Sequence, residues 1–298
     1  MHLARPWLSA VLLAVLVFLP LSASAGMTPE EVKAFEGYRK LADKGDRVAQ
    51  DYMGRCYSYG SGVAKDDAEA VKWYRKAAEQ GDTNGQLSLG GCYLVGKGVA
   101  KDEVEAVKWY RKAADQGDAL GQTNLGYRYQ YGEGVAKDDA EAVKWFRKAA
   151  DQGDANGYLS LGLCYLRGTG VAKDEVEAVK WFRRGADQGE LQAQFCLGRC
   201  YLKGEGVAKD SVQAVSWYRK SAEQGLALAQ FGLGYCYENG TGVAKDEIEA
   251  YAYYNLPGRE FKDSARENLA VLEKKMSSEQ IAAGKKRTKE LQKAIEAK

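Results

Sequence analysis

A short string that recurs at a fixed interval constrains this chain more than any other feature. Gly-Val-Ala-Lys-Asp occurs six times in the 298 residues, and each copy begins 36 residues after the previous one. The six copies begin at Gly62, Gly98, Gly134, Gly170, Gly206 and Gly242. An aromatic residue keeps the same interval at Trp73, Trp109, Trp145, Trp181, Trp217 and Tyr253. A constant period of this length predicts a solenoid whose units pack mainly on their neighbours.

Each repeat predicts a pair of helices. In the first repeat Ala49, Met53 and Cys56 fall on one helical stripe and predict the first helix. Asp66, followed three residues later by Glu69, is a helix-start signal, because the Asp oxygen accepts from the free amides of the first turn. Alanines and aromatic residues then follow the spacing of a buried helix face. We therefore expect an all-α solenoid of antiparallel helix pairs.

A glycine lies in the middle of every predicted first helix. These glycines are Gly54, Gly90, Gly126, Gly162, Gly198 and Gly234. A glycine inside a helix costs about 1 kcal/mol relative to alanine. Its recurrence predicts a place where another helix passes too close for a larger side chain. The glycines of the recurring string follow a helix and not a strand, which favours a structural turn over a phosphate-binding loop.

The repeats predict the organisation of the chain. Six units are expected over residues 45–260, at 45–80, 81–116, 117–152, 153–188, 189–224 and 225–260. Residues 26–44 predict an N-terminal capping helix, since Thr28 followed by Pro29 and two acids is a strong helix start. Residues 261–298 predict two charged C-terminal capping helices, over 263–276 and 278–297, which suit the end of a solenoid.

The first 25 residues are expected to be a signal peptide. Arg5 precedes an apolar run over residues 7–19, and Ala23-Ser24-Ala25 is a small-residue cleavage site. An uncleaved membrane anchor is the alternative, but the run is shorter than the roughly 20 residues that span a bilayer. Cleavage after Ala25 predicts a periplasmic or secreted protein with no membrane span. It also removes His2, the only histidine.

The repeat resembles the Sel-one-like repeat family, a branch of the tetratricopeptide-like helical repeats. The resemblance covers roughly residues 30 to 290. In the first repeat it rests on Ala49-Gln50, Met53-Gly54, Tyr57, Gly60, Gly62-Val63, Asp66, Ala70, Trp73-Tyr74 and Ala77-Ala78. It implies a right-handed superhelix with a concave inner wall and a role as an adaptor for other proteins. It also implies a bacterial protein exported to the cell envelope.

The cysteines leave two interpretations open. They are Cys56, Cys92, Cys164, Cys196, Cys200 and Cys236. An even number in an exported protein suggests disulfides. However, all but Cys196 occupy one repeat position, which Arg128 takes in the third repeat. Equivalent positions in packed helices lie about 8–10 Å apart, whereas a disulfide needs Cα atoms within about 7 Å. We therefore favour small buried thiols.

Catalysis is the less favoured function. The resemblance raises one enzymatic alternative, because cysteine-rich family members from Helicobacter have been described as penicillin-binding and β-lactamase-like. This chain lacks their cysteine on the second helix, and it has no Ser-x-x-Lys motif. A mature chain without histidine also lacks a Cys-His pair and the usual zinc ligands. We expect no enzyme activity, cofactor or metal, and a fluorescent penicillin would test the alternative.

A partner protein or peptide is expected on the concave wall. A net charge of +2 gives no electrostatic argument for nucleic acid. Positions that vary between repeats form a second stripe on the first helices, and in tetratricopeptide-like solenoids that stripe lines the groove. The expected contact residues are Leu87, Leu94, Tyr127, Tyr131, Leu159, Leu163, Arg167, Phe195, Arg199, Lys203, Phe231, Tyr235 and Glu238. For the leucines, burial between neighbouring first helices is an equal alternative.

Overall fold

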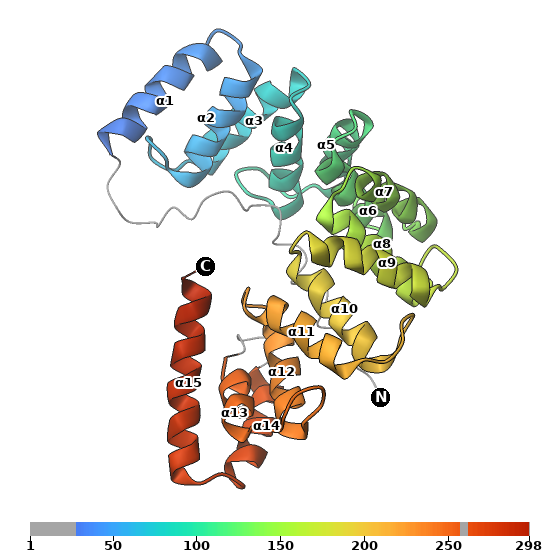
Figure 1. Ribbon diagram of the computed structural model, residues 1–298. Helices are drawn as coiled ribbons and strands as arrows, with labels where there is room; N and C mark the ends of the chain where they lie inside the picture. The colour runs from blue at the N-terminus through green and yellow to red at the C-terminus, as the bar shows by residue number, and fades with distance from the viewer. Residues whose placement is uncertain (1–27, 257–261, 298) are drawn as a thin grey trace.

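The computed structural model describes residues 28–256 and 262–297. All regular secondary structure in these two ranges is helical and forms fifteen helices (Figure 1). The expected signal peptide, residues 1–25, lies outside the described residues. Among the helices that are described, none is long and apolar enough to cross a bilayer.

The repeats form the predicted pairs of helices. The first helices are α2 (Arg47–Tyr59), α4 (Thr83–Val95), α6 (Ala119–Tyr131), α8 (Ala155–Arg167), α10 (Leu191–Lys203) and α12 (Ala227–Asn239). The second helices are α3 (Asp67–Glu79), α5 (Glu103–Asp115), α7 (Asp139–Asp151), α9 (Glu175–Asp187), α11 (Ser211–Ala222) and α13 (Glu247–Tyr254). The all-α solenoid with a 36-residue repeat is therefore confirmed.

Side-chain caps and glycine turns set the ends of these helices. Asp66 accepts a hydrogen bond of 2.9 Å from the Glu69 amide at the start of α3. An aspartate caps each of the remaining five second helices in the same way. The first helices end at a left-handed glycine such as Gly132, with φ of +70°. Gly134, two residues later, packs against the Glu103 carbonyl of the preceding repeat, where a Cβ would collide with it. The repeated string is therefore a turn that fits one repeat onto the next.

The mid-helix glycines make room for the second helix of the same repeat. A Cβ built on Gly126 would lie 2.6 Å from the ring of Phe146, and one on Gly90 would lie 2.8 Å from Tyr110. The other four glycines face the corresponding aromatic ring in the same way. These distances are shorter than van der Waals contact, so the expectation of a close helix crossing is confirmed.

Polar contacts between repeats recur with the same period. The Gln80 amide donates to the Gln50 side chain at 2.7 Å, and Gln50 donates to the Ala42 carbonyl at 3.1 Å. An arginine on a second helix donates to a tyrosine on the next first helix, as Arg219 does to Tyr237 at 2.9 Å. The same pairing recurs at four earlier junctions. Both sets of bonds fix how each repeat sits on its neighbour.

Three further helices close the two ends. The N-terminal helix α1 (Pro29–Ala42) begins with the predicted capping box and ends two residues earlier than expected. At the other end α13 is short, and α14 (Lys262–Glu273) and α15 (Ser278–Glu296) follow. A Cβ on Gly284 would lie 2.5 Å from the Tyr251 ring, so α15 packs closely against α13.

The first helices lie on the inner side of the solenoid. From α2 to α10, each first helix contacts the first helix of the next repeat, while successive second helices have no comparable contact. In a curved stack of helix pairs, the helices that approach their counterparts in the next repeat more closely lie on the inner side of the curve. Figure 1 shows the repeats following an open arc, with α1 near one end and α15 near the other. The first helices therefore line the concave side, where the sequence predicts the variable stripe.

Candidate interaction surface

The residues predicted to contact a partner fall into three groups by exposure. Leu87 and Leu159 are buried, with 7% and 3% of their surface exposed. Each packs into the apolar core of its junction, and the partly buried Leu94 and Leu163 pack against the same cores. Leu87 and Leu159 are therefore buried between neighbouring first helices, which is the alternative interpretation of the leucines. The curvature of the solenoid brings the next repeat against this position.

The second group comprises half-buried aromatic residues that rest on the second helices. Phe195 stacks on Tyr218 with ring centroids 5.4 Å apart, and Phe231 lies 5.4 Å from Tyr254. The Tyr127 hydroxyl forms a hydrogen bond of 2.7 Å with Ser160 of the next repeat. These side chains are only partly exposed, and most of their area supports the packing of the repeats.

The third group remains open to solvent. Tyr131 and Tyr235 are 38% and 49% exposed, and Arg167 and Lys203 are exposed as well. Glu238 is partly buried and belongs instead to the C-terminal junction, where it accepts from the Tyr254 hydroxyl at 2.9 Å and pairs with Lys275 at 3.7 Å.

The open surface continues toward the N-terminus through two residues outside the set of expected contacts. Tyr59 and Val95 are 50% and 63% exposed. They occupy the same repeat position as Tyr131, at 72 and 36 residues before it. The 36-residue spacing from Tyr131 therefore identifies both residues in the sequence. We call Tyr59, Val95, Tyr131, Arg167 and Lys203 the end row, because each is the last residue of its first helix.

The end row changes from apolar to basic along the solenoid. Arg167 and Lys203 follow Val95 and Tyr131, and Arg199 lies one helical turn before Lys203. Burial raises the pKa of the Tyr131 hydroxyl, and the positive charge of Arg167 opposes that rise.

The cysteines are unsuited to nucleophilic catalysis. All six are buried free thiols in the structure. Burial raises the pKa of Cys56 and Cys92 to about 11, and that of Cys164 and Cys196 to about 12. The thiolate is the reactive form, so these groups are almost entirely protonated at neutral pH. No group of three metal-ligating side chains occurs in the described residues.

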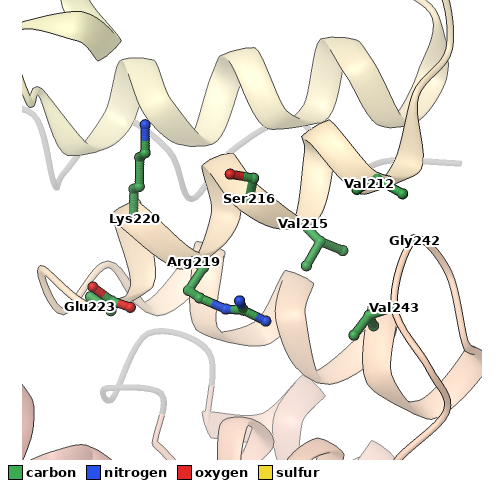
Figure 2. Close-up of a pocket in the computed structure, with 8 residues that line it drawn as sticks. All are labelled: Val212, Val215, Ser216, Arg219, Lys220, Glu223, Gly242 and Val243. Carbon is green, nitrogen blue, oxygen red and sulfur yellow. The ribbon is translucent and has the colours of Figure 1, made fainter.

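A hollow beside the second helix of repeat five also lacks a thiol or an imidazole that could act as a nucleophile or base. It has a volume of about 470 Å³ and lies between α11 and the repeat-six turn at Gly242 and Val243. Figure 2 shows Val215, Arg219 and Val243 bordering this space. Its lining contains neither a cysteine nor a histidine.

Fold and surface together define a class of protein. A 36-residue period, antiparallel helix pairs and a variable concave side are the features of a helical-repeat solenoid. The chain belongs to the Sel1 repeat family, whose repeat matches residues 47–82, 83–118, 119–154, 155–190, 191–226 and 227–256. Proteins of this family are generally scaffolds for protein interactions. No match was found among functionally curated proteins.

One solved structure supports this assignment, and two others are similar in sequence. A Sel1 repeat protein from Oxalobacter formigenes is 36% identical, with a TM-score of 0.73 over 77% of this chain and 92% of that one. Cysteine rich protein B of Helicobacter pylori is 32% identical over 43% of this chain and 92% of that one, with a TM-score of 0.36. The protective antigen c5321 of uropathogenic Escherichia coli is 29% identical over 89% and 81%, with a TM-score of 0.47.

Proposed function

We propose that this protein is a non-catalytic scaffold that binds a protein or peptide along its concave side, in the periplasm or outside the cell. The observation that carries the proposal is the contrast between the two faces of the first helices. One face is filled by the same packing in every repeat. The other exposes aromatic, apolar and cationic side chains that differ from repeat to repeat. Such side chains are typical of the residues that dominate protein interfaces.

The absence of a poised reactive group also favours binding over hydrolysis. The buried thiols hold their protons, and the described part of the chain contains no histidine to act as a base. Export rests on the expected signal peptide at residues 1–25, and it agrees with the exported family members that the resemblance implies.

Affinity capture from cell-envelope extract tests the proposal. The mature chain from Gly26 is immobilised beside a variant with Tyr131→Ala and Tyr235→Ala, which removes two exposed rings. Trp145→Ala, a core change on the second helix α7, is the control for damage to the fold. We expect a protein captured by the native chain and depleted at least tenfold with the double variant. Equal capture by both would place binding elsewhere and overturn the proposal.

A further inference from the structure

We propose that the concave side binds an acidic peptide segment, whose carboxylates pair with Arg167, Arg199 and Lys203 while its apolar residues lie against Val95 and Tyr131. This inference rests on the proposed function and specifies the chemistry of the partner. It is carried by the two arginines, whose environment differs from that of the other arginines in the repeats.

Arg167 and Arg199 have no acidic partner. Within the described residues, neither forms an ion pair or a side-chain hydrogen bond, and the Nε atom of Arg199 is buried without a partner. Other arginines of the repeats are engaged. Arg55 pairs with Asp51 at 2.9 Å, and Arg128 pairs with Glu133. The arginines Arg75, Arg111, Arg147, Arg183 and Arg219 donate to tyrosines. A guanidinium without a partner, exposed in Arg167 and half-buried in Arg199, favours an anion supplied by a ligand.

The two guanidinium groups without partners lie on neighbouring first helices, α8 and α10, which contact each other. Burial raises the pKa of the Cys196 thiol, and the charges of both Arg199 and Arg167 act against that rise. Arg167 ends α8 and Arg199 lies one turn before the end of α10, so the arginines lie on the two sides of the junction of repeats four and five. Lys203 lies one turn beyond Arg199 on the same helix. Three cations therefore lie near the ends of two successive first helices.

Neighbouring acids do not neutralise this cluster. Glu190 is nearby, but its carboxylate accepts from the amides of Gln192 and Ala193 as the cap of α10. Glu205 pairs with Lys203 at 3.5 Å. That pair is partly exposed, so a ligand carboxylate can compete for the lysine. The two arginines remain as uncompensated charge.

The apolar half of the end row makes a peptide a better fit than a nucleic acid. Val95 is aliphatic and cannot stack on a base, and only three cations are present where a phosphate backbone needs a longer track. Packed helices lie about 8–10 Å apart, and an extended chain advances about 3.3 Å per residue. One repeat therefore spans about three peptide residues. We expect apolar residues followed at three-residue spacing by Asp or Glu.

Selection from a displayed library of random twelve-residue peptides tests the inference with the mature chain. We expect the selected peptides to be enriched in Asp and Glu, with apolar residues about three positions before them. Binding of a labelled selected peptide, measured by fluorescence polarisation, should weaken at least tenfold with the double variant Arg167→Gln and Arg199→Gln. It should also weaken between 50 and 500 mM NaCl, as expected for ion pairs.

The matched control is Lys144→Gln with Lys180→Gln, which removes two positive charges from the exposed second-helix face of repeats three and four. It should change the affinity by less than twofold, and circular dichroism should show both double variants folded. Selected peptides without acidic enrichment, or acidic peptides that bind the arginine variant equally well, would overturn the inference. So would tighter binding of a twelve-nucleotide single-stranded DNA than of any selected peptide. If acid-free peptides bind and Tyr131→Ala abolishes that binding, only the inference fails and the scaffold function stands.

Discussion

The Thr123 hydroxyl donates a hydrogen bond of 2.9 Å to the carboxylate of Asp154, across the junction between repeats three and four. Asp154 caps α8 through the Gly157 amide, so one carboxylate serves both the helix and the junction. Two repeats earlier, Asp51 and Asp82 occupy the same two positions. There an acid replaces the hydroxyl donor, and both aspartates are buried.

Asp51→Thr should stabilise the protein at neutral pH. Burial raises the pKa of Asp51 to about 6, the charge of Arg55 opposes this, and the charge of Asp82 adds to it. A carboxyl whose pKa is raised on folding destabilises the fold when ionised, and that penalty disappears as the pH falls through 6 toward 4. We expect a gain of about 1–2 kcal/mol at pH 7.5 and a smaller one at pH 4.5, measured by thermal unfolding.

The reverse change is the control for this junction. Thr123→Asp places a second carboxylate beside Asp154 and should destabilise the protein at pH 7.5 more than at pH 4.5. Equal effects of Asp51→Thr at both pH values would show that the charge of Asp51 is not what strains the junction.

Gly126→Ala should destabilise the protein by about 2 kcal/mol or more, because the new methyl group would lie 2.6 Å from the Phe146 ring. Gly37→Ala is the matched change in α1, where nothing lies within 4 Å of an added Cβ. It should stabilise the protein by about 0.5–1 kcal/mol, since alanine is the better helix former. Chemical denaturation measures both, and a destabilising Gly37→Ala together with a neutral Gly126→Ala would contradict this account of the glycines.

The packing of each repeat could be predicted from the sequence because it depends on local spacing. The Gly126 contact with Phe146 and the Asp66 cap both lie within one repeat, and an unchanging period identifies such positions. Variation between repeats was less informative. Leu87, Thr123 and Leu159 share one variable position, yet all three are buried.

Their burial follows from the curvature of the solenoid, which depends on the rise and rotation between repeats. At that position the side chain packs against the next repeat, as Thr123 does against Asp154. Its variation therefore accompanies burial and not exposure to solvent. The end row is variable because it is exposed, and a single sequence does not distinguish the two causes.

The cysteine thiols should be free and slow to react. Titration of the denatured, unreduced mature protein should find at least four thiols, since all six are unpaired in the structure. In the native protein at pH 8, modification should be slow, because burial raises the pKa of Cys200 and Cys236 to about 11. A fluorescent penicillin should give no covalent labelling. Two or fewer titratable thiols would indicate disulfides, and labelling would support the hydrolase alternative.

Export predicts a defined N-terminus. Edman sequencing of the protein from an envelope or culture-medium fraction should begin at Gly26, after the Ala23-Ser24-Ala25 site. As a control, Ala23→Arg with Ala25→Arg should block cleavage and leave a larger, membrane-associated form. A native protein that retains Met1 would contradict both the compartment and the loss of His2.

Single alanine variants should separate residues that bind from residues that pack. Tyr235 is 49% exposed, so Tyr235→Ala should change the free energy of unfolding by less than about 1 kcal/mol. Arg199→Ala removes a guanidinium without a partner and should also leave stability nearly unchanged. Both should weaken partner binding, by up to about thirtyfold where the loss reaches 2 kcal/mol.

Phe195→Ala and Tyr127→Ala should lower the stability of the protein, unlike Tyr235→Ala and Arg199→Ala, although all four residues belong to the same predicted stripe. Phe195 stacks on Tyr218, and Tyr127 bonds to Ser160, so each truncation should cost about 2–3 kcal/mol of stability. Trp145→Ala, with a buried indole on α7, sets the scale for a core change at about 3 kcal/mol or more. Thermal unfolding beside a binding assay measures the two effects for every variant. If Tyr235→Ala destabilises the protein as much as Phe195→Ala does, the open surface is part of the core and the interaction surface must lie elsewhere on the solenoid.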